Sequence, residues 1–189
     1  YTVLTSSAAS DVYKRQRLEA EIIRDSALAA SGLLHEKMSG PPVRPPQPAA
    51  ARGVDFRKSQ WTASTGPDRH RRSIYTYQKR TSPFAMFTTF DAGSGEACIA
   101  RRDVSNTPLQ ALTLLNDPMF IEIAQAYGKH IEATPGDTDA RITFAFRRIL
   151  TRPPTPDVLE LLRGFHSKHI DWSALARALL SLDESVTKN

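Results

Sequence analysis

Residues Arg71–Asn116 read RRSIYTYQKRTSPFAMFTTFDAGSGEACIARRDVSNTPLQALTLLN. Within this run, the alternating side chains of Ser73–Arg80 predict a short strand. Pro83–Phe90 is aromatic and partly apolar, and Asp91–Gly95 has the Asp and Gly content of a turn. Thr107–Pro108 places a capping residue before a proline, which is typical of a helix start. The run therefore predicts a short extended aromatic segment, then a turn, then a helix.

The same type of start signal recurs toward the C-terminus. Asp117–Pro118 and Thr155–Pro156 repeat the cap-and-proline device, and Asp171 is a further capping residue. Apolar residues recur at helical spacing in Thr138–Leu150. The C-terminal half is therefore expected to be a series of helices: PLQALTLLN, PMFIEIAQAYGKHI, Thr138–Leu150, VLELLRGF and WSALARALLSL.

Residues Arg17–Met38 predict another helix, which Ser39–Pro42 ends. Pro41–Pro48, PPVRPPQP, is expected to be extended, because proline fixes φ and disfavours helix in the preceding residue. In Ala49–Pro67, Trp61 is the large anchor. The apolar stripe of the helix contains Leu18, Ile22, Ala29 and Leu33, widened by Ile23, Ala30 and Leu34, and its opposite face contains Arg17, Glu21, Arg24 and Asp25.

These patterns predict a mainly α fold: an irregular helical module with a short extended aromatic segment and long Pro-rich loops. No sequence repeat longer than a helical period is present, which argues against a solenoid. No apolar run approaches the roughly 20 residues that span a bilayer, so we expect no membrane span.

The first residues, Tyr1–Gln16, differ in composition from the rest. Asp11–Gln16 is one translation of GATGTGTATAAGAGACAG, which resembles a transposon-end adapter used in sequencing libraries. A natural disordered N-terminus is the alternative, which the Ser, Thr and Ala content also fits. We expect residues 1–16 to be non-native or disordered, and 17–189 to be the C-terminal part of a longer domain whose upstream domains are missing.

The charge and cysteine content restrict the chemistry. A net charge of +5 weakly favours acidic partners. Cys98 is the single cysteine, so neither an internal disulfide nor a thiolate metal cage is possible, and we expect it to be buried and unreactive. The histidines His35, His130, His166 and His169 show neither HExxH nor CxxCH spacing, and we infer no metal or cofactor site in this fragment.

Two charged clusters have both a functional and a structural interpretation. Glu21 and Asp25 are one helical turn apart and could act as an acid pair, but Arg17 and Arg24 would neutralise them, which favours a solvated or domain-contacting face. Arg69–Arg72 lies near further basic and aromatic residues, a mixture that can bind nucleic acid. No nucleic-acid motif is complete, so arginines that pair with buried carboxylates are the favoured interpretation.

A third cluster surrounds the Gly-rich loop and comprises Asp91, Glu96, Arg101, Arg102 and Asn106. Its carboxylates could converge on a hard cation such as Ca²⁺, although the spacing matches no EF-hand loop. We favour an internal network that pins the loop against the following helix. In that arrangement Arg101 and Arg102 bind Asp91, Glu96 or Asp117 through charge-assisted hydrogen bonds, and Asn106 or Thr107 caps the helix.

Taken together, several segments resemble one bacterial family. RLEAEIIRD, STGPDRHRRSIYTYQKRTSP, FTTFDAGSGEACIARRDVSNTPLQALTLLNDPMF and FRRILTRPPTPDVLELL resemble the C-terminal part of the planctomycete domain of unknown function fifteen-fifty-three. The most specific motif is Arg101–Arg102, Asn106–Leu112 and Leu115–Asp117, with Asp103–Ser105 in place of a more basic or Thr-rich spacer. The resemblance covers about Arg17 to Lys188.

The resemblance implies an upstream partner domain in the same polypeptide, often with a c-type haem module, in a protein that is periplasmic or extracellular. It carries over no catalytic residues. The matched polar positions form a candidate cluster: Asp91, Glu96, Arg101, Arg102, Asn106 and Asn116. We expect a binding or scaffold role, with an acidic polysaccharide as a possible ligand and nucleic acid disfavoured. The alternative is an accessory part of a hydrolase or redox enzyme that acts on extracellular polysaccharide, with its site shared with the upstream domain.

Overall fold

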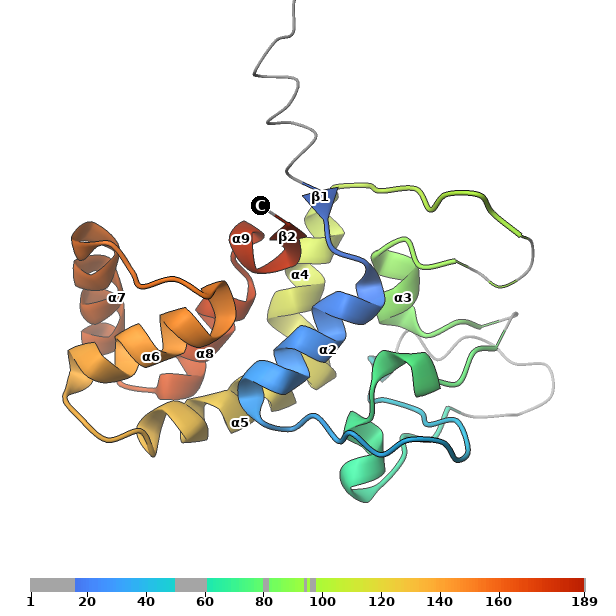
Figure 1. Cartoon of the computed structure of the whole chain (residues 1–189), viewed down its shortest axis with the longest axis horizontal. Helices are drawn as coiled ribbons and strands as arrows, with labels where there is room; N and C mark the ends of the chain where they lie inside the picture. The colour runs from blue at the N-terminus through green and yellow to red at the C-terminus, as the bar shows by residue number, and fades with distance from the viewer. Residues whose placement is uncertain (1–15, 50–60, 80–81, 94, 96–97, 189) are drawn as a thin grey trace, which may run out of the picture.

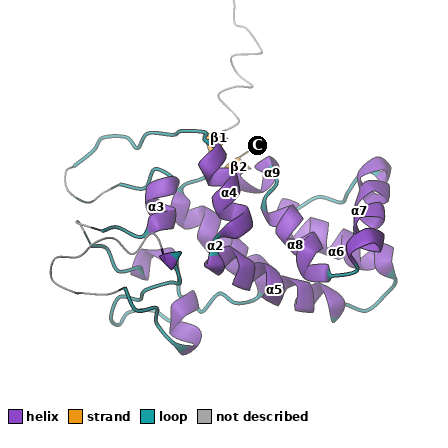
Figure 2. Ribbon diagram, turned by 180° about the vertical axis from the view of Figure 1, so that it is seen from behind, coloured by secondary structure: helices purple, strands orange, loops and turns teal. Residues whose placement is uncertain are grey.

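The computed structural model describes residues 16–49, 61–79, 82–93, 95 and 98–188. Its C-terminal part is a helical assembly, and its N-terminal part combines one long helix with irregular segments (Figure 1). In that view the irregular segments lie on the right and α6 and α7 on the left, and Figure 2 shows the same arrangement from behind. The main helices are α2 (Ala20–Ser31), α4 (Pro108–Asn116), α5 (Pro118–Glu132), α6 (Thr138–Leu150), α7 (Pro156–His169) and α8 (Trp172–Leu180).

The helix starts expected between Thr107 and Asp171 are confirmed. The side chain of Asp117 accepts a hydrogen bond from the N–H of Met119 (2.8 Å), and Asp171 accepts one from Ser173 (2.8 Å). At the start of α4, Gln110 accepts a hydrogen bond from the N–H of Thr107 (3.4 Å). These side chains satisfy N–H groups that have no partner within the helix, and so they fix where each helix begins.

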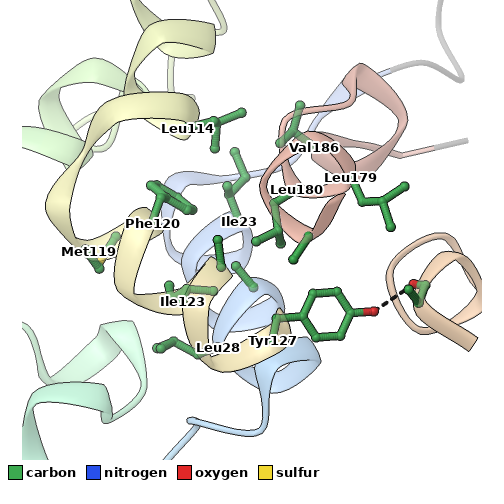
Figure 3. Packing of buried hydrophobic residues seen from close by; sticks show 14 of the residues in the cluster. Ile23, Leu28, Leu114, Met119, Phe120, Ile123, Tyr127, Leu179, Leu180 and Val186 are labelled. Carbon is green, nitrogen blue, oxygen red and sulfur yellow. Dashed lines mark hydrogen bonds between the residues drawn. The ribbon is translucent and has the colours of Figure 1, made fainter. Parts of the chain in front are cut away.

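Helix α5 lies at the centre and packs against α2, α4, α6 and α8. Figure 3 shows its buried side chains facing those of α2 and α8. The hydroxyl of Tyr127 donates a hydrogen bond to the carbonyl of Ala145 (2.7 Å), which ties α5 to α6. Gly128 permits close approach to α8, because a Cβ there would lie 2.6 Å from the backbone nitrogen of Ser173. The core residues of α5 are Met119, Phe120, Ile123, Ala124, Tyr127 and Ile131.

The first and last described segments pair as a short antiparallel sheet. Strand β1 (Gln16–Arg17) lies beside β2 (Thr187–Lys188), with Gln16 opposite Lys188. Helix α9 (Asp183–Val186) precedes β2, and its Val186 carbonyl accepts a hydrogen bond from Leu18 (2.7 Å). The expectation for residues 1–16 cannot be compared with a structure for most of its length, because residues 1–15 lie outside the described residues.

Helix α2 differs from the expected helix in length and orientation. It ends at Ser31 rather than Met38, because Gly32 takes a left-handed conformation (φ 74°) that closes the helix. Arg24, expected on the polar face, is fully buried, whereas Ile22 is 48% exposed. The expected apolar stripe is therefore rotated, because the irregular segments supply polar partners for Arg24 inside the protein.

The prediction of a strand that begins at Ser73 is wrong. Ser73–Tyr75 forms a 3₁₀ helix, η3, and Thr76 forms one isolated bridge with Val43. The facing segment is Pro-rich, and prolines have no N–H to extend a ladder beyond Val43. A second 3₁₀ helix, η2 (Gly66–His70), precedes η3, and a short helix, α3 (Ala85–Thr89), forms within the aromatic segment.

Two fully buried arginines organise the irregular segments. Arg24 donates hydrogen bonds to the carbonyls of Arg71 (2.8 Å) and Arg69 (3.0 Å), and burial lowers the pKa of Arg24 to about 10. The guanidinium of Arg71 binds the carbonyls of Lys37, Ser39 and Pro41 at 2.6–3.1 Å. These side chains satisfy main-chain groups that no regular secondary structure satisfies.

Candidate functional site

A groove of about 600 Å³ runs along the outer side of α2, and we call it the α2 groove. One wall comes from α2 and the residue before it, and the opposite wall from η3 with its neighbours. Phe87 of α3 and Arg102 of the loop before α4 complete the lining. The side chains that decide its chemistry are Glu19, Glu21, Ile22, Asp25, Arg72 and Ile74.

At one end of the α2 groove, Arg102 forms a two-pronged ion pair with Glu21. The two guanidinium–carboxylate distances are 2.7 and 3.0 Å, and Glu19 lies 3.5 Å from the same guanidinium. The hydrogen bonds to Glu21 raise the pKa of Arg102, with a smaller contribution from the nearby charges. Arg102 thus connects the loop before α4 to α2 across 81 positions of sequence.

Toward the other end, Asp25 links α2 to η3. One carboxylate oxygen accepts a hydrogen bond from the N–H of Ser73 (2.7 Å), and the other lies 3.7 Å from Arg72. Ile22 and Ile74 also line the groove and are 48% and 77% exposed. The groove therefore combines exposed apolar side chains with ion pairs that are already formed.

A second polar cluster holds the loop before α4. Asp91, which has a left-handed conformation (φ 57°), binds Arg17 at 2.6 Å and the backbone N–H of Ser105 at 2.9 Å. Burial would raise the pKa of Asp91, but the hydrogen bonds from Ser105 and Arg17 outweigh it and lower that pKa. Gln110 donates to the carbonyl of Thr89 (3.0 Å). The loop is thus pinned, as expected, but Asp91 binds Arg17 rather than Arg101 or Arg102, and Arg102 holds the loop through Glu21 instead.

The expected cluster is not brought together at one point. Asp91 binds Arg17, Arg102 lines the α2 groove, and Arg101 and Asn106 are exposed. Asn116 lies at the far end of α4, where it accepts a hydrogen bond from Arg177 (3.2 Å). Glu96 lies outside the described residues.

Sequence reasoning missed Arg17, Ser105 and Gln110 as members of the polar cluster. Gln110 carried a local signal, because it occupies the third position of a helix that Thr107 caps. Arg17 carried none, because its partner Asp91 is 74 positions away.

Two other expectations also require correction. Cys98 is exposed rather than buried, because the residues described around it form an exposed loop and not part of the core. Of the basic residues near Tyr75, Arg71 has partners within the protein, but they differ from the expected carboxylates: Arg71 binds carbonyl groups and stacks on Tyr75 (3.8 Å). Arg69 pairs with a half-exposed carboxylate, Glu122, at 2.7 Å.

Neither a metal site nor a membrane-spanning helix is found in the part of the chain that the structure describes. No group of three or more His, Cys, Asp or Glu side chains in that part is placed to hold a metal ion. None of its helices combines the length and apolarity needed to cross a bilayer.

Comparison with known proteins identifies the family. The family model described as PSD1, Protein of unknown function (DUF1553), matches residues 6–166, and the chain belongs to this family. The match runs from before β1 into α7 and confirms the resemblance drawn from the sequence motifs. No curated protein and no solved structure matches the chain.

Proposed function

We propose that this member of the family is a binding module that docks onto another folded domain through the α2 groove. The observation that carries the proposal is the position of Ile22 and Ile74. Both are exposed in a groove whose ends hold the Arg102–Glu21 and Arg72–Asp25 pairs. Apolar side chains surrounded by a polar rim are the usual composition of a protein–protein interface.

The ion pairs of the groove also favour a rigid docking surface. Glu21 and Asp25 are held by side chains or backbone of other elements, so their rotamers are already ordered in the unbound chain. Binding therefore loses less side-chain entropy than it would on a surface of free charged residues. We propose the upstream domain of the same exported polypeptide as the partner, following the family resemblance.

An acidic polysaccharide fits this groove less well than a protein surface does. The groove holds three carboxylates, Glu19, Glu21 and Asp25, against two guanidinium groups, those of Arg72 and Arg102. Its formal charge is thus negative, although the whole chain carries +5. An anionic polymer, nucleic acid included, would be repelled rather than attracted at this surface.

Titration of this chain against the separately produced upstream region, by calorimetry, tests the proposal. Ile74→Glu places a charge at the apolar centre, and we expect affinity to fall at least about tenfold, as at an interface hot spot. Leu161→Glu, at an exposed leucine (69%) on α7, is the matched control and should bind like the wild type. Unchanged affinity for a combined Ile22→Glu and Ile74→Glu variant would refute docking through this groove.

An enzymatic role is the second candidate, because Glu21 and Asp25 both line a sizeable groove. In that case Glu21→Gln and Asp25→Asn should abolish polysaccharide cleavage by the full-length protein while leaving the docking affinity nearly intact. In a binding module, the same substitutions change docking and leave any activity of the upstream domain at its ordinary rate. Activity assays of the full-length variants, paired with the titration, separate the two roles.

A further inference from the structure

A cavity of about 380 Å³, which we call the α4–α9 pocket, lies where α4 and α9 approach the β1–β2 sheet. Figure 3 shows Leu114 of α4 and Val186 of α9 facing each other, and both line the pocket together with the exposed Val104. The pocket shares no described lining residue with the α2 groove. Small-molecule sites in proteins occupy about 300–1,000 Å³, so the size of the pocket suits a small ligand with an apolar body.

Arg17 is the basic residue of the lining, but its guanidinium already has partners within the protein. It donates hydrogen bonds to the carbonyls of Ser105 and Phe90, both at 3.1 Å, and to the carboxylate of Asp91 at 2.6 Å. Asp91 also balances the charge of Arg17. An anionic ligand would have to compete with these charge-assisted bonds, so the pocket does not favour an anion.

Asp183, the acidic residue of the lining, is exposed and free to accept a new partner. Its carboxylate forms neither an ion pair nor a hydrogen bond with the residues that the structure describes. The side-chain amide of Asn106, on the loop before α4, also has no partner among these residues. The pocket therefore presents a carboxylate and an amide oxygen, both hydrogen-bond acceptors, to a ligand.

Two helix ends meet the pocket, and their partial charges oppose one another. Helix α4 begins after Thr107, where its dipole is positive, whereas α8 ends before Ser181, where its dipole is negative, and both of these residues line the pocket. Both helices have nine residues, so the two partial charges are similar in size and nearly cancel. The full negative charge of Asp183 therefore remains.

The charged residues beside the lining do not reverse this sign. Glu184 is paired with Arg152, with two oxygen–nitrogen distances of 2.7 and 2.6 Å. Asp103 and Lys188, each adjacent in sequence to a lining residue, are exposed and carry opposite charges. The pocket thus combines an apolar wall with one unpaired negative charge.

We propose that the α4–α9 pocket binds a small molecule in which a protonated amine is attached to an apolar body. The ammonium group donates hydrogen bonds to the carboxylate of Asp183 and to the side-chain oxygen of Asn106, and the apolar body lies against the apolar wall. A hydrogen bond between charged groups is roughly twice as strong as one between neutral groups. The pocket therefore distinguishes an amine from an alcohol of the same shape.

Two-dimensional proton–nitrogen NMR of the purified chain tests the proposal with three probes of nearly the same shape: cyclohexylmethylammonium, cyclohexylmethanol and cyclohexanecarboxylate. We expect the ammonium probe to shift the backbone amide signals of Asn106, Gln110 and Val186 in a saturable way. It should bind at least about tenfold more tightly than the alcohol or the carboxylate. Equal affinity for the ammonium probe and the alcohol, tighter binding of the carboxylate, or no saturable shift at these signals overturns the proposal.

Variants assign the binding to this pocket. Asp183→Asn should weaken binding of the ammonium probe about tenfold and leave that of the alcohol unchanged. Asp157→Asn, at another exposed carboxylate in the first turn of a helix, is the matched control and should bind like the wild type. An Asp183→Asn variant that binds the ammonium probe as tightly as the wild type overturns the assignment.

A second variant tests the pocket without changing its charge. Ala111→Phe, at an exposed lining residue of α4, fills the cavity and should abolish binding of the ammonium probe. An unchanged circular dichroism spectrum verifies that the variant is folded, and full binding by the folded variant contradicts the proposal. Ile74→Glu in the α2 groove should leave binding of the probe unchanged, which keeps this outcome separate from that of the docking experiment.

Discussion

The C-terminal helices and the irregular segments between α2 and α3 are stabilised in opposite ways. The helices bury apolar faces against α5, with Tyr127 and Gly128 at the closest contacts. The irregular segments surround two charged side chains, Arg24 and Arg71, whose partners are mostly main-chain carbonyls. Where prolines prevent regular hydrogen bonding, side-chain donors must satisfy the backbone instead. Buried arginines therefore stabilise the irregular segments, whereas apolar packing stabilises the C-terminal helices.

The largest effect is expected from Arg24→Met, which keeps the side-chain volume and removes the donors. Two carbonyl groups, those of Arg69 and Arg71, would lose a charged partner inside the protein. We expect the free energy of unfolding to fall by roughly 3–5 kcal/mol. Denaturant titration measures the loss. Arg163→Met, which removes an exposed ion pair with Asp139, is the control and should leave the midpoint unchanged. If both variants lowered the denaturation midpoint equally, the buried Arg24 would contribute no more to stability than an exposed ion pair does, which would contradict this account of the irregular region.

Gly128→Ala should produce the largest loss among helix substitutions. The added Cβ would lie 2.6 Å from the backbone nitrogen of Ser173, so α5 and α8 would have to separate. We expect a cost of about 3 kcal/mol. Gly164→Ala in α7 meets nothing within 4 Å and should instead stabilise the protein, by about 0.5–1 kcal/mol. Thermal melts measure both effects. If the melting temperatures of the two variants shifted in the same direction, this account of the helix packing would be contradicted.

A smaller difference is expected between the two arginines that hold the loop before α4. Arg17 is 10% exposed and binds Asp91, and Arg17→Met should cost about 2 kcal/mol. Arg102 is 36% exposed, and Arg102→Met should cost only about 0.5–1 kcal/mol, the scale of a surface ion pair. Chemical denaturation of both variants measures the difference. A larger loss for Arg102→Met than for Arg17→Met would contradict this ranking of the two ion pairs.

The smallest effect is a pH dependence confined to the irregular region. Burial lowers the pKa of His70 below 6.5, although Glu122 acts in the opposite direction and the nearby Arg69 and Arg24 add to the lowering. A lowered pKa means that the folded state binds the proton less readily than the unfolded state does. The contribution of His70 to stability is therefore fully present above pH 6.5 and is lost as the pH falls through the folded-state pKa.

Thermal melts of wild type and His70→Gln across this range measure that dependence. The wild type should lose more stability on acidification than the variant, and hydrogen exchange should locate the loss in η2. Identical pH profiles would show that His70 does not contribute. A loss located in α5 to α8 instead would contradict the assignment to the irregular region.

The helices α4 to α8 were predictable because their signals are local. Pro118 and its cap Asp117 are adjacent in the sequence, and so are Thr155 and Pro156. A capping side chain bonds to a backbone group two or three residues away, so the sequence alone carries the geometry. The apolar spacing of Thr138–Leu150 likewise predicted a helix, which is α6.

The irregular region and the candidate site depended on contacts between distant parts of the chain. Arg24 has the sequence context of a surface arginine, and only the carbonyls of η2 and its neighbours make it a buried one. Arg102 meets Glu21 across 81 positions, and no local pattern distinguishes that partner from Asp91. Which acceptor an arginine binds depends on the distance between the groups and on their burial, and both are properties of the folded chain. The sequence by itself thus determined where the helices begin, whereas the tertiary structure decided which face of α2 is buried, which charges are buried, which pair, and that Ile22 and Ile74 share a groove.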